Sequence, residues 1–460
     1  MTTQIFLAST LYGTATLAAA VDSGCFDAAD RRILLVTNNA ATPETTPSLD
    51  AMPGFERLRG RFDDVVSWNE AIFPFHPGDW SPRAGDVPLW ERHLRLAWGL
   101  GDDDVALTVE SIQVPPALGV AQIFTDAPLT VYADGLMSYG PTRTKLAPLV
   151  GTRVERLLHL DLVPGLTPLL LTEFGVEPEI VPSAAFTKVL AELADTDTVT
   201  STSTSTSTDT DTGAGLPDAE RPAVLLGQYL SALGILRAEE EEDLHVRMLT
   251  GVAALGHTRV LFKTHPTAPA RFTRVLEREA DRLGVDLTVV ETPVLAEVLF
   301  QRTRPALVVG CFSTALLTAS VLYGLPVARV GTETLLDRLT PYENSNRVPA
   351  TLVDALLPDL SDPAAVAEGR RDVDADELAA LVRAVGFAMQ PKVLPELRPA
   401  AEAYLRAHLD ARTWRYFKKR RLTSLGLPGG IPARLGFLPH NSTARRVVRR
   451  ARAIRRSIGR

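Results

Sequence analysis

The chain has 460 residues, of which 45% are apolar, and a net charge of −7. This length predicts two or three domains, each able to bury a hydrophobic core. The two cysteines, Cys25 and Cys311, lie far apart, which excludes a disulfide framework and a thiolate metal site and favours a reducing compartment. No apolar run approaches the ~20 residues of a membrane-spanning helix, and the N-terminus lacks the basic start of a signal peptide. We expect a cytoplasmic protein, soluble or peripheral at the inner face of the membrane.

Short apolar and β-branched runs recur along the first 190 residues at intervals that fit a parallel α/β sheet. We expect helices at residues 14–21 and 88–100, and strands at residues 5–8, 33–36, 63–68, 105–110 and 129–132. Residues 195–215 alternate Thr with Ser or Asp and have almost nothing apolar to bury, which predicts a flexible linker or a long surface loop. The pattern then resumes with strands expected at residues 224–226, 260–263, 287–290, 307–310 and 327–330.

Alternating strands and helices of this kind predict parallel sheets that are covered on both faces. The expected fold is α/β, with two Rossmann-like domains whose parallel sheets face a cleft, plus a basic C-terminal helical tail. The boundaries that we expect are residues 1–190 for the N-terminal domain, 191–220 for the linker, 221–400 for the C-terminal domain and 401–460 for the tail. Because ligands of open α/β sheets bind beyond the carboxyl ends of the strands, polar groups at those ends are the first candidates for a site.

The tail carries the charge asymmetry of the chain. Residues 411–460 contain 15 Lys or Arg and no Asp or Glu, so a net charge of −22 remains for the rest. Between residues 444 and 460, apolar residues recur at helical spacing while arginines occupy another face. This predicts a basic amphipathic helix that suits an anionic membrane surface. A polyanionic acceptor, nucleic acid and plain solvent are the alternatives; we expect no nucleic-acid partner.

The first polar motif at a strand end is Asp134-Gly135, directly after the strand expected at residues 129–132. A carboxylate at the edge of a cleft can act as a general base toward a hydroxyl group. The same dipeptide is also an ordinary turn, because Asp and Gly both favour turns for local reasons.

The second motif is Lys263-Thr264-His265-Pro266, after the strand expected at residues 260–263. A histidine here can donate a hydrogen bond to a phosphate oxygen, since its pKa lies near physiological pH. The alternative is a histidine in a surface turn.

The third motif is the pair Ser313-Thr314, between a strand and a helix expected at about residues 315–323. The free N–H groups and the positive end of the dipole make a helix start suitable for binding an anion. Ser and Thr are also common N-cap residues, and the two roles are compatible.

The order of an acidic-Gly motif, a His-Pro after a strand and a Ser/Thr pair opening a helix resembles the bacterial sialyltransferases of GT-B fold, and most closely the α-2,8-polysialyltransferase family. The similar stretches are residues 132–143, 225–228, 262–266 and 310–317, and the similarity covers about residues 1–350. The resemblance implies inverting, metal-independent transfer of sialic acid from CMP-sialic acid to a glycan hydroxyl. It implies no cofactor, a nucleotide-sugar donor and a glycan acceptor as partners, and a place in the synthesis of a capsule or another cell-surface polysaccharide.

The resemblance also implies roles for individual residues. Asp134 corresponds to the general base, and His265 to the histidine that contacts the CMP phosphate and assists its departure. Ser313 and Thr314 would bind the same phosphate, with Lys263 and Pro266 next to the donor. The family motif usually carries two consecutive acids, whereas Ala133 stands before Asp134 here, which leaves the choice of acceptor and polymerising activity open.

Two other functions remain open from the sequence. One is a cell-envelope polymer transferase that uses another CMP-linked or CDP-linked donor, and the other is a catalytically inactive scaffold that binds nucleotides or glycans. The run Asp102-Asp103-Asp104 could suggest a metal site for a nucleotide diphosphate. It precedes its strand instead of following it, so a solvated acidic turn is favoured.

Overall fold

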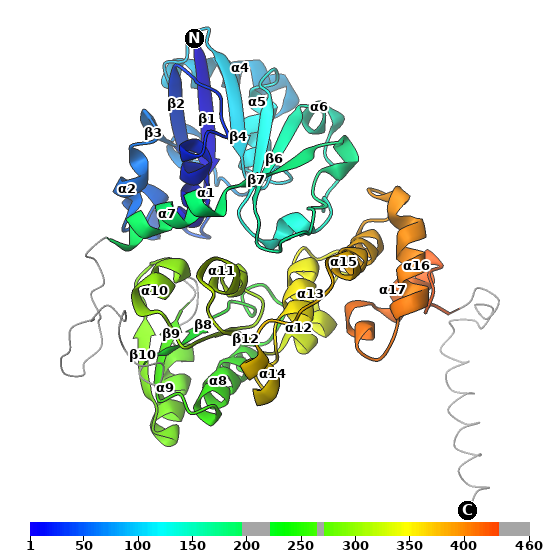
Figure 1. Ribbon diagram of the computed structural model, residues 1–460. Helices are drawn as coiled ribbons and strands as arrows, with labels where there is room; N and C mark the ends of the chain where they lie inside the picture. The colour runs from blue at the N-terminus through cyan, green and yellow to red at the C-terminus, as the bar shows by residue number, and fades with distance from the viewer. Residues whose placement is uncertain (196–220, 265–270, 432–460) are drawn as a thin grey trace, which may run out of the picture.

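The computed structural model describes residues 1–195, 221–264 and 271–431, which form two α/β domains, one above the other in Figure 1. Every strand pair in both sheets is parallel across these residues. Each sheet consists of short, largely apolar strands joined through helices, because parallel neighbours need a crossover connection. The predicted fold class of two Rossmann-like domains is confirmed.

The N-terminal sheet has the strand order β3-β2-β1-β4-β5-β6-β7. All five strands predicted for this half are present, whereas β6 and β7 were not predicted. The strands are β1 (Thr2–Ala8), β2 (Arg31–Val36), β3 (Asp64–Ser67), β4 (Asp104–Val109), β5 (Leu129–Ala133), β6 (Val154–Leu160) and β7 (Glu177–Val181). The helices are α1 (Leu11–Asp22), α2 (Phe55–Arg59), α3 (Trp68–Ala71), α4 (Val87–Ala97), α5 (Ala117–Ile123), α6 (Pro148–Gly151) and α7 (Ser183–Ala194).

The C-terminal sheet has the order β10-β9-β8-β11-β12, and all five of its strands were predicted. They are β8 (Ala223–Leu226), β9 (Arg259–Lys263), β10 (Asp286–Val290), β11 (Leu307–Gly310) and β12 (Val327–Arg329). The helices are α8 (Ala238–Ala254), α9 (Arg271–Leu283), α10 (Ala296–Thr303), α11 (Thr314–Tyr323), α12 (Thr332–Arg338), α13 (Arg347–Leu356), α14 (Pro363–Glu368), α15 (Ala375–Met389), α16 (Arg398–His408) and α17 (Lys419–Leu425).

One of the two clusters of buried hydrophobic residues extends across both domains. One face of the N-terminal sheet packs on a core of its own, which includes Ile5, Leu7 and Trp68. The other face belongs to a cluster that continues into the C-terminal domain. The helices α7 and α10 pack against each other where the domains meet (Figure 1). At this contact the Arg302 guanidinium donates two hydrogen bonds, of 2.9 and 2.7 Å, to the carbonyl of Ala194 at the end of α7.

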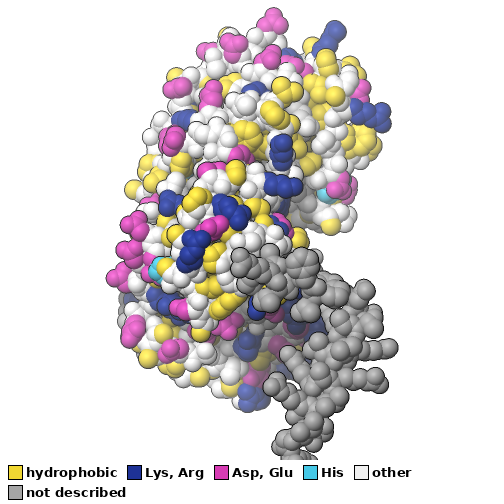
Figure 2. Space-filling model, turned by 90° about the vertical axis from the view of Figure 1, so that its right-hand side faces the viewer, with side chains coloured by type: hydrophobic (Ala, Val, Ile, Leu, Met, Phe, Trp, Pro, Cys, Tyr) yellow, Lys and Arg dark blue, Asp and Glu magenta, His cyan; other side chains and the backbone are white. Residues whose placement is uncertain are grey.

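The first part of the predicted tail packs on the C-terminal domain. The helices α16 and α17 lie against α15 (Figure 1), and Ala401 and Leu422 on them are fully buried. The amphipathic helix predicted at residues 444–460 lies outside the described residues, as does most of the Thr-rich segment (residues 196–220), so both stay predictions. Acidic and basic side chains are scattered over both domains on the face that Figure 2 shows. Within the described part of the chain, no helix is both long and apolar enough to span a membrane.

The strand order fixes where each sheet can bind a ligand. In the N-terminal sheet, β2 and β3 follow outward on the side of β1, and β5, β6 and β7 follow outward on the side of β4. In the C-terminal sheet, β9 and β10 lie on the side of β8, and β12 lies on the side of β11. A crevice opens beyond the carboxyl ends of the strands at such a switch point. The segments after β1, β4, β8 and β11 are therefore the expected ligand-binding segments.

Candidate active site

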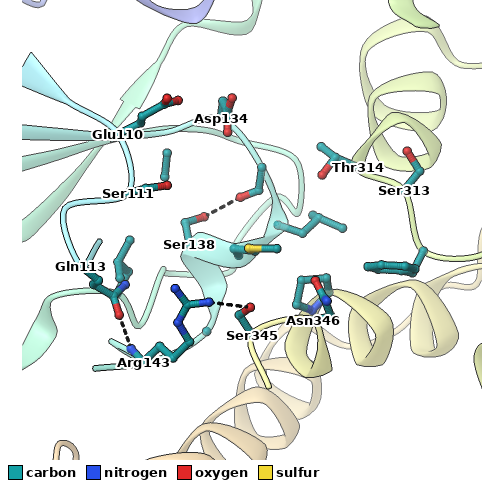
Figure 3. Close-up of a pocket in the computed structure, with 18 of the residues that line it drawn as sticks. Glu110, Ser111, Gln113, Asp134, Ser138, Arg143, Ser313, Thr314, Ser345 and Asn346 are labelled. Carbon is teal, nitrogen blue, oxygen red and sulfur yellow. Dashed lines mark hydrogen bonds between the residues drawn. The ribbon is translucent and has the colours of Figure 1, made fainter. Parts of the chain in front are cut away.

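A pocket of about 360 Å³ lies between the two domains. Its volume falls in the range typical of small-molecule sites. Residues that follow β4 and β5 line it from the N-terminal domain, and residues that follow β8 and β11 line it from the C-terminal domain (Figure 3). Three of the four switch-point segments, those after β4, β8 and β11, thus line one pocket, whereas the segment after β1 does not. Its polar lining consists mainly of Glu110, Ser111, Gln113, Asp134, Arg143, Gln228, Ser313, Thr314, Ser345 and Asn346.

Asp134 lies where the sequence predicted it, directly after β5, and lines the pocket. Gly135 follows it and touches the other domain, because a Cβ on Gly135 would lie 3.0 Å from the Thr314 hydroxyl oxygen. Burial raises the pKa of the Asp134 carboxyl above its usual value, since the charged form loses solvation. Asp134, whose carboxyl group has a raised pKa, therefore lies next to a residue that contacts the helix start at Thr314 in the other domain.

Ser313 and Thr314 open the ten-residue helix α11, as predicted. Ser313 is the N-cap, and its hydroxyl oxygen accepts a hydrogen bond of 3.2 Å from the Ala315 N–H. Both side chains line the pocket, and Figure 3 shows them on the side facing Asp134. The helix start presents the positive end of its dipole, which suits an anion.

Lys263 lies outside the pocket that Asp134, Ser313 and Thr314 line. It ends β9 and is only 8% exposed, and its ammonium group donates a hydrogen bond of 3.0 Å to the Thr264 carbonyl. Burial lowers its pKa to about 8, against the opposing field of the buried Glu297 carboxylate. It is not among the residues that line the pocket. His265 and Pro266 lie outside the described residues, so their predicted roles stay predictions.

The segment after β8 is held against the pocket by two buried side chains of α8. The Glu241 carboxylate accepts hydrogen bonds from the backbone N–H groups of Leu230 and Ser231 at 2.8 and 2.9 Å. Nε2 of His245 accepts one of 3.2 Å from the Gln228 N–H. This contact requires the unprotonated nitrogen, and burial accordingly lowers the pKa of His245 to about 4. The pocket wall formed by Gly227, Gln228 and Tyr229 is thereby fixed.

Sequence reasoning missed several residues of the pocket, and two of them carry a charged side chain, Glu110 and Arg143. Glu110 follows β4, next to β5, and the strand-end rule that found Asp134 could have found it too. Arg143 lies in a loop and is placed by long-range contacts. Its backbone N–H donates to the Gln113 side chain at 2.5 Å and its carbonyl accepts from Gln390 at 2.6 Å, while its guanidinium donates to the Ser345 hydroxyl at 3.3 Å. No local pattern indicates such a position.

The acidic run at residues 102–104 lies away from the pocket. Asp103 accepts a hydrogen bond of 2.8 Å from the Thr3 hydroxyl, and Asp104 begins β4. This agrees with a structural turn. Across the described residues, no three or more His, Cys, Asp or Glu side chains cluster closely enough to hold a metal ion.

The fold has two α/β domains with a pocket between them, and comparison with known proteins gives the class and the family. The family model described as alpha-2,8-polysialyltransferase (POLYST) matches residues 4–332, which is more than half of the chain. The chain therefore belongs to the alpha-2,8-polysialyltransferase family. A search of curated proteins found no match.

Several solved structures are similar to the chain in fold. One is the UDP-GlcNAc 2-epimerase from Methanocaldococcus jannaschii, with a TM-score of 0.46 and 11% identity over 80% of this chain and 91% of that chain. Another is the GT-B domain of the sialyltransferase from Photobacterium damselae, with a TM-score of 0.40 and 10% identity over 77% and 96%. A third is an O-GlcNAc transferase mutant from Thermobaculum terrenum, with a TM-score of 0.35 and 15% identity over 90% and 68%.

Proposed function

We propose that the protein transfers sialic acid from CMP-sialic acid to a hydroxyl group of a glycan, with inversion at the anomeric carbon and without a metal ion. The observation that supports this most is that Asp134 and the Ser313-Thr314 helix start line the same pocket from opposite domains. Membership of the polysialyltransferase family supports the sugar and the nucleotide.

In the proposed reaction Asp134 removes the proton from the acceptor hydroxyl as its oxygen bonds to the anomeric carbon. The bond from that carbon to the CMP phosphate oxygen breaks, and its electron pair stays on the phosphate. Ser313, Thr314 and the N–H groups of α11 stabilise this phosphate, and His265 donates to it. The raised pKa of Asp134 suits a general base, because a base works best when its pKa lies near the operating pH.

Arg143 is assigned to a sugar carboxylate within this proposal. It is the single Lys or Arg among the described residues that line the pocket, and no carboxylate side chain pairs with it in the hydrogen bonds and ion pairs of that part of the chain. A guanidinium can donate two parallel hydrogen bonds to a carboxylate, and sialic acid carries one.

The test is CMP release from CMP-sialic acid in the presence of EDTA, with and without sialylated oligosaccharide acceptors. We expect release to rise with acceptor and to tolerate EDTA, and Asp134→Asn to lower kcat by about 100-fold or more, the scale of general-base catalysis. Asp102→Asn, in the exposed acidic turn, is the matched control and should leave kcat unchanged.

Consumption of a different activated sugar, with no CMP release from CMP-sialic acid, would refute the donor. CMP binding without turnover of any donor in the parent protein, unchanged by Asp134→Asn, would refute the enzymatic role.

A further inference from the structure

Glu110 is a second carboxyl group in the pocket, next to Asp134. The two residues follow the neighbouring strands β4 and β5, which pair in register from Leu107 with Leu129 to Val109 with Val131. Both line the pocket, and Figure 3 draws both on the same side of it. Two carboxyl groups this close repel each other when both are ionised, so their protons are coupled.

The Tyr132 hydroxyl is shared between the Glu110 carboxyl group and a backbone carbonyl. The Tyr132 hydroxyl lies 3.0 Å from the Leu7 carbonyl oxygen and 3.2 Å from Oε2 of Glu110. This hydroxyl has one proton to donate and two neighbouring acceptors. If it donates to the Leu7 carbonyl, which can only accept, a proton on Glu110 allows the carboxyl group to donate back to the Tyr132 oxygen. Every member of the group is then satisfied.

Burial and charge act on the Glu110 proton in one direction, and hydrogen bonds act in the other. Ser9 hydrogen-bonds to Glu110 and lowers its pKa, while Tyr12 on α1 and Glu297 on α10 interact with Asp134 from the adjacent elements. No cation separates the two carboxyl groups within the described residues that line the pocket. Burial, and then the field of Asp134, raise the pKa of Glu110 to about 7.

We propose that Glu110 is a positioning residue of the catalytic site, which keeps its proton below neutral pH so that Asp134 alone carries negative charge there. This inference rests on the proposed function of Asp134 as base. Above neutral pH, Glu110 loses its proton, and a second negative charge faces the base and the anionic donor. Activity therefore falls as the pH rises, because of Glu110.

The experiment compares pH profiles of kcat/KM from about pH 5 to 9 for wild type, Glu110→Gln and Glu155→Gln. Gln imitates the neutral carboxyl group, so Glu110→Gln should lose the alkaline decline of kcat/KM. Glu155, exposed on β6, is the matched control and should keep the wild-type profile. An unchanged alkaline decline in Glu110→Gln would overturn the proposal, as would a loss of activity as deep as that of Asp134→Asn at every pH.

A second measurement needs no donor and separates this proposal from the proposed function. Infrared difference spectra of wild type against Glu110→Gln report the protonated carboxyl band of Glu110 as the pH changes. We expect the band to titrate with a midpoint near pH 7, and a midpoint near the ordinary value of about 4.3 would overturn the proposal. A midpoint near 7 in a protein that leaves CMP-sialic acid intact would contradict only the donor.

Discussion

The buried carboxylate of Asp354 should contribute about 3–5 kcal/mol to the free energy of unfolding of the C-terminal domain. Asp354 is 1% exposed and lies on α13. It accepts hydrogen bonds from the Thr332 hydroxyl at 2.6 Å and the Tyr416 hydroxyl at 2.8 Å, and forms an ion pair with Arg329 at 3.1 Å. Arg415 also pairs with it at 3.3 Å. These contacts join β12, α12 and the segment that precedes α17 to one side chain.

Asp354→Ala removes the shared partner from all of these groups. Arg329 is only 2% exposed and keeps Asp359 at 2.8 Å as its remaining carboxylate, while the buried Tyr416 and Thr332 hydroxyls lose their acceptor. Removing one member of a buried ion pair costs about 3–5 kcal/mol, because the other charge stays buried. For a domain of roughly 200 residues this corresponds to a fall in Tm of about 6–20 °C.

The assay is thermal unfolding followed by Trp fluorescence, which includes Trp414 in the affected segment. Asp337→Ala is the matched control, because Asp337 pairs with Lys418 of the same segment at 3.4 Å but is 83% exposed in its side chain. An exposed pair contributes about 0–1 kcal/mol. If Asp354→Ala unfolded within about 1 kcal/mol of Asp337→Ala, the reasoning from burial would be wrong.

Two further predictions concern the pocket walls. Gly135→Ala should lower kcat by about tenfold, because the new Cβ pushes on Thr314. Tm should stay nearly unchanged, because alanine also adopts the backbone conformation of Gly135. Gly60→Ala, with no neighbour within 4 Å of the new Cβ, is the control, and equal kcat in both variants would contradict the domain contact. His245 is protonated in the unfolded chain below pH 6.5 but in the folded protein only near pH 4, so stability should fall by about 2 kcal/mol from pH 7 to pH 5. Denaturant unfolding of His245→Gln should lack this part of the pH dependence, and an identical loss in the variant would exclude His245 as its origin.

The predicted strands were found where apolar runs are short and continuous. The runs of β1, β2, β8 and β11 are buried on both faces of parallel sheets, and such strands are visible in the sequence alone. The edge strand β7 contains Glu177, Pro178 and Glu179, which do not suggest a strand by themselves. Pairing with β6 supplies its structure, and this information is not local.

The residues of the site also divide into those that a local pattern indicates and those that only long-range contacts place. Asp134 was found because it immediately follows β5, and Ser313 and Thr314 because they open the helix after β11; a parallel sheet brings such positions to one edge. Arg143 reaches the pocket only because Gln390 and Ser345, more than 200 residues further along the chain, contact it. Glu110 could have been found from its place after β4, but its relation to Asp134 depends on the order of the strands.

The division of the site between the domains makes their packing part of the proposed mechanism. The N-terminal domain carries the acidic side chains of the pocket, and the C-terminal domain carries the helix start that suits a phosphate. Gly135 and Thr314 form one of the contacts between these two halves, so a small shift of one domain changes the distance between the proposed base and the proposed phosphate site. The extended apolar core shared through α7 and α10 opposes such a shift, since close-packed interiors yield little without losing contacts. The packed contact between α7 and α10 therefore supports the proposed reaction, which takes its groups from both domains.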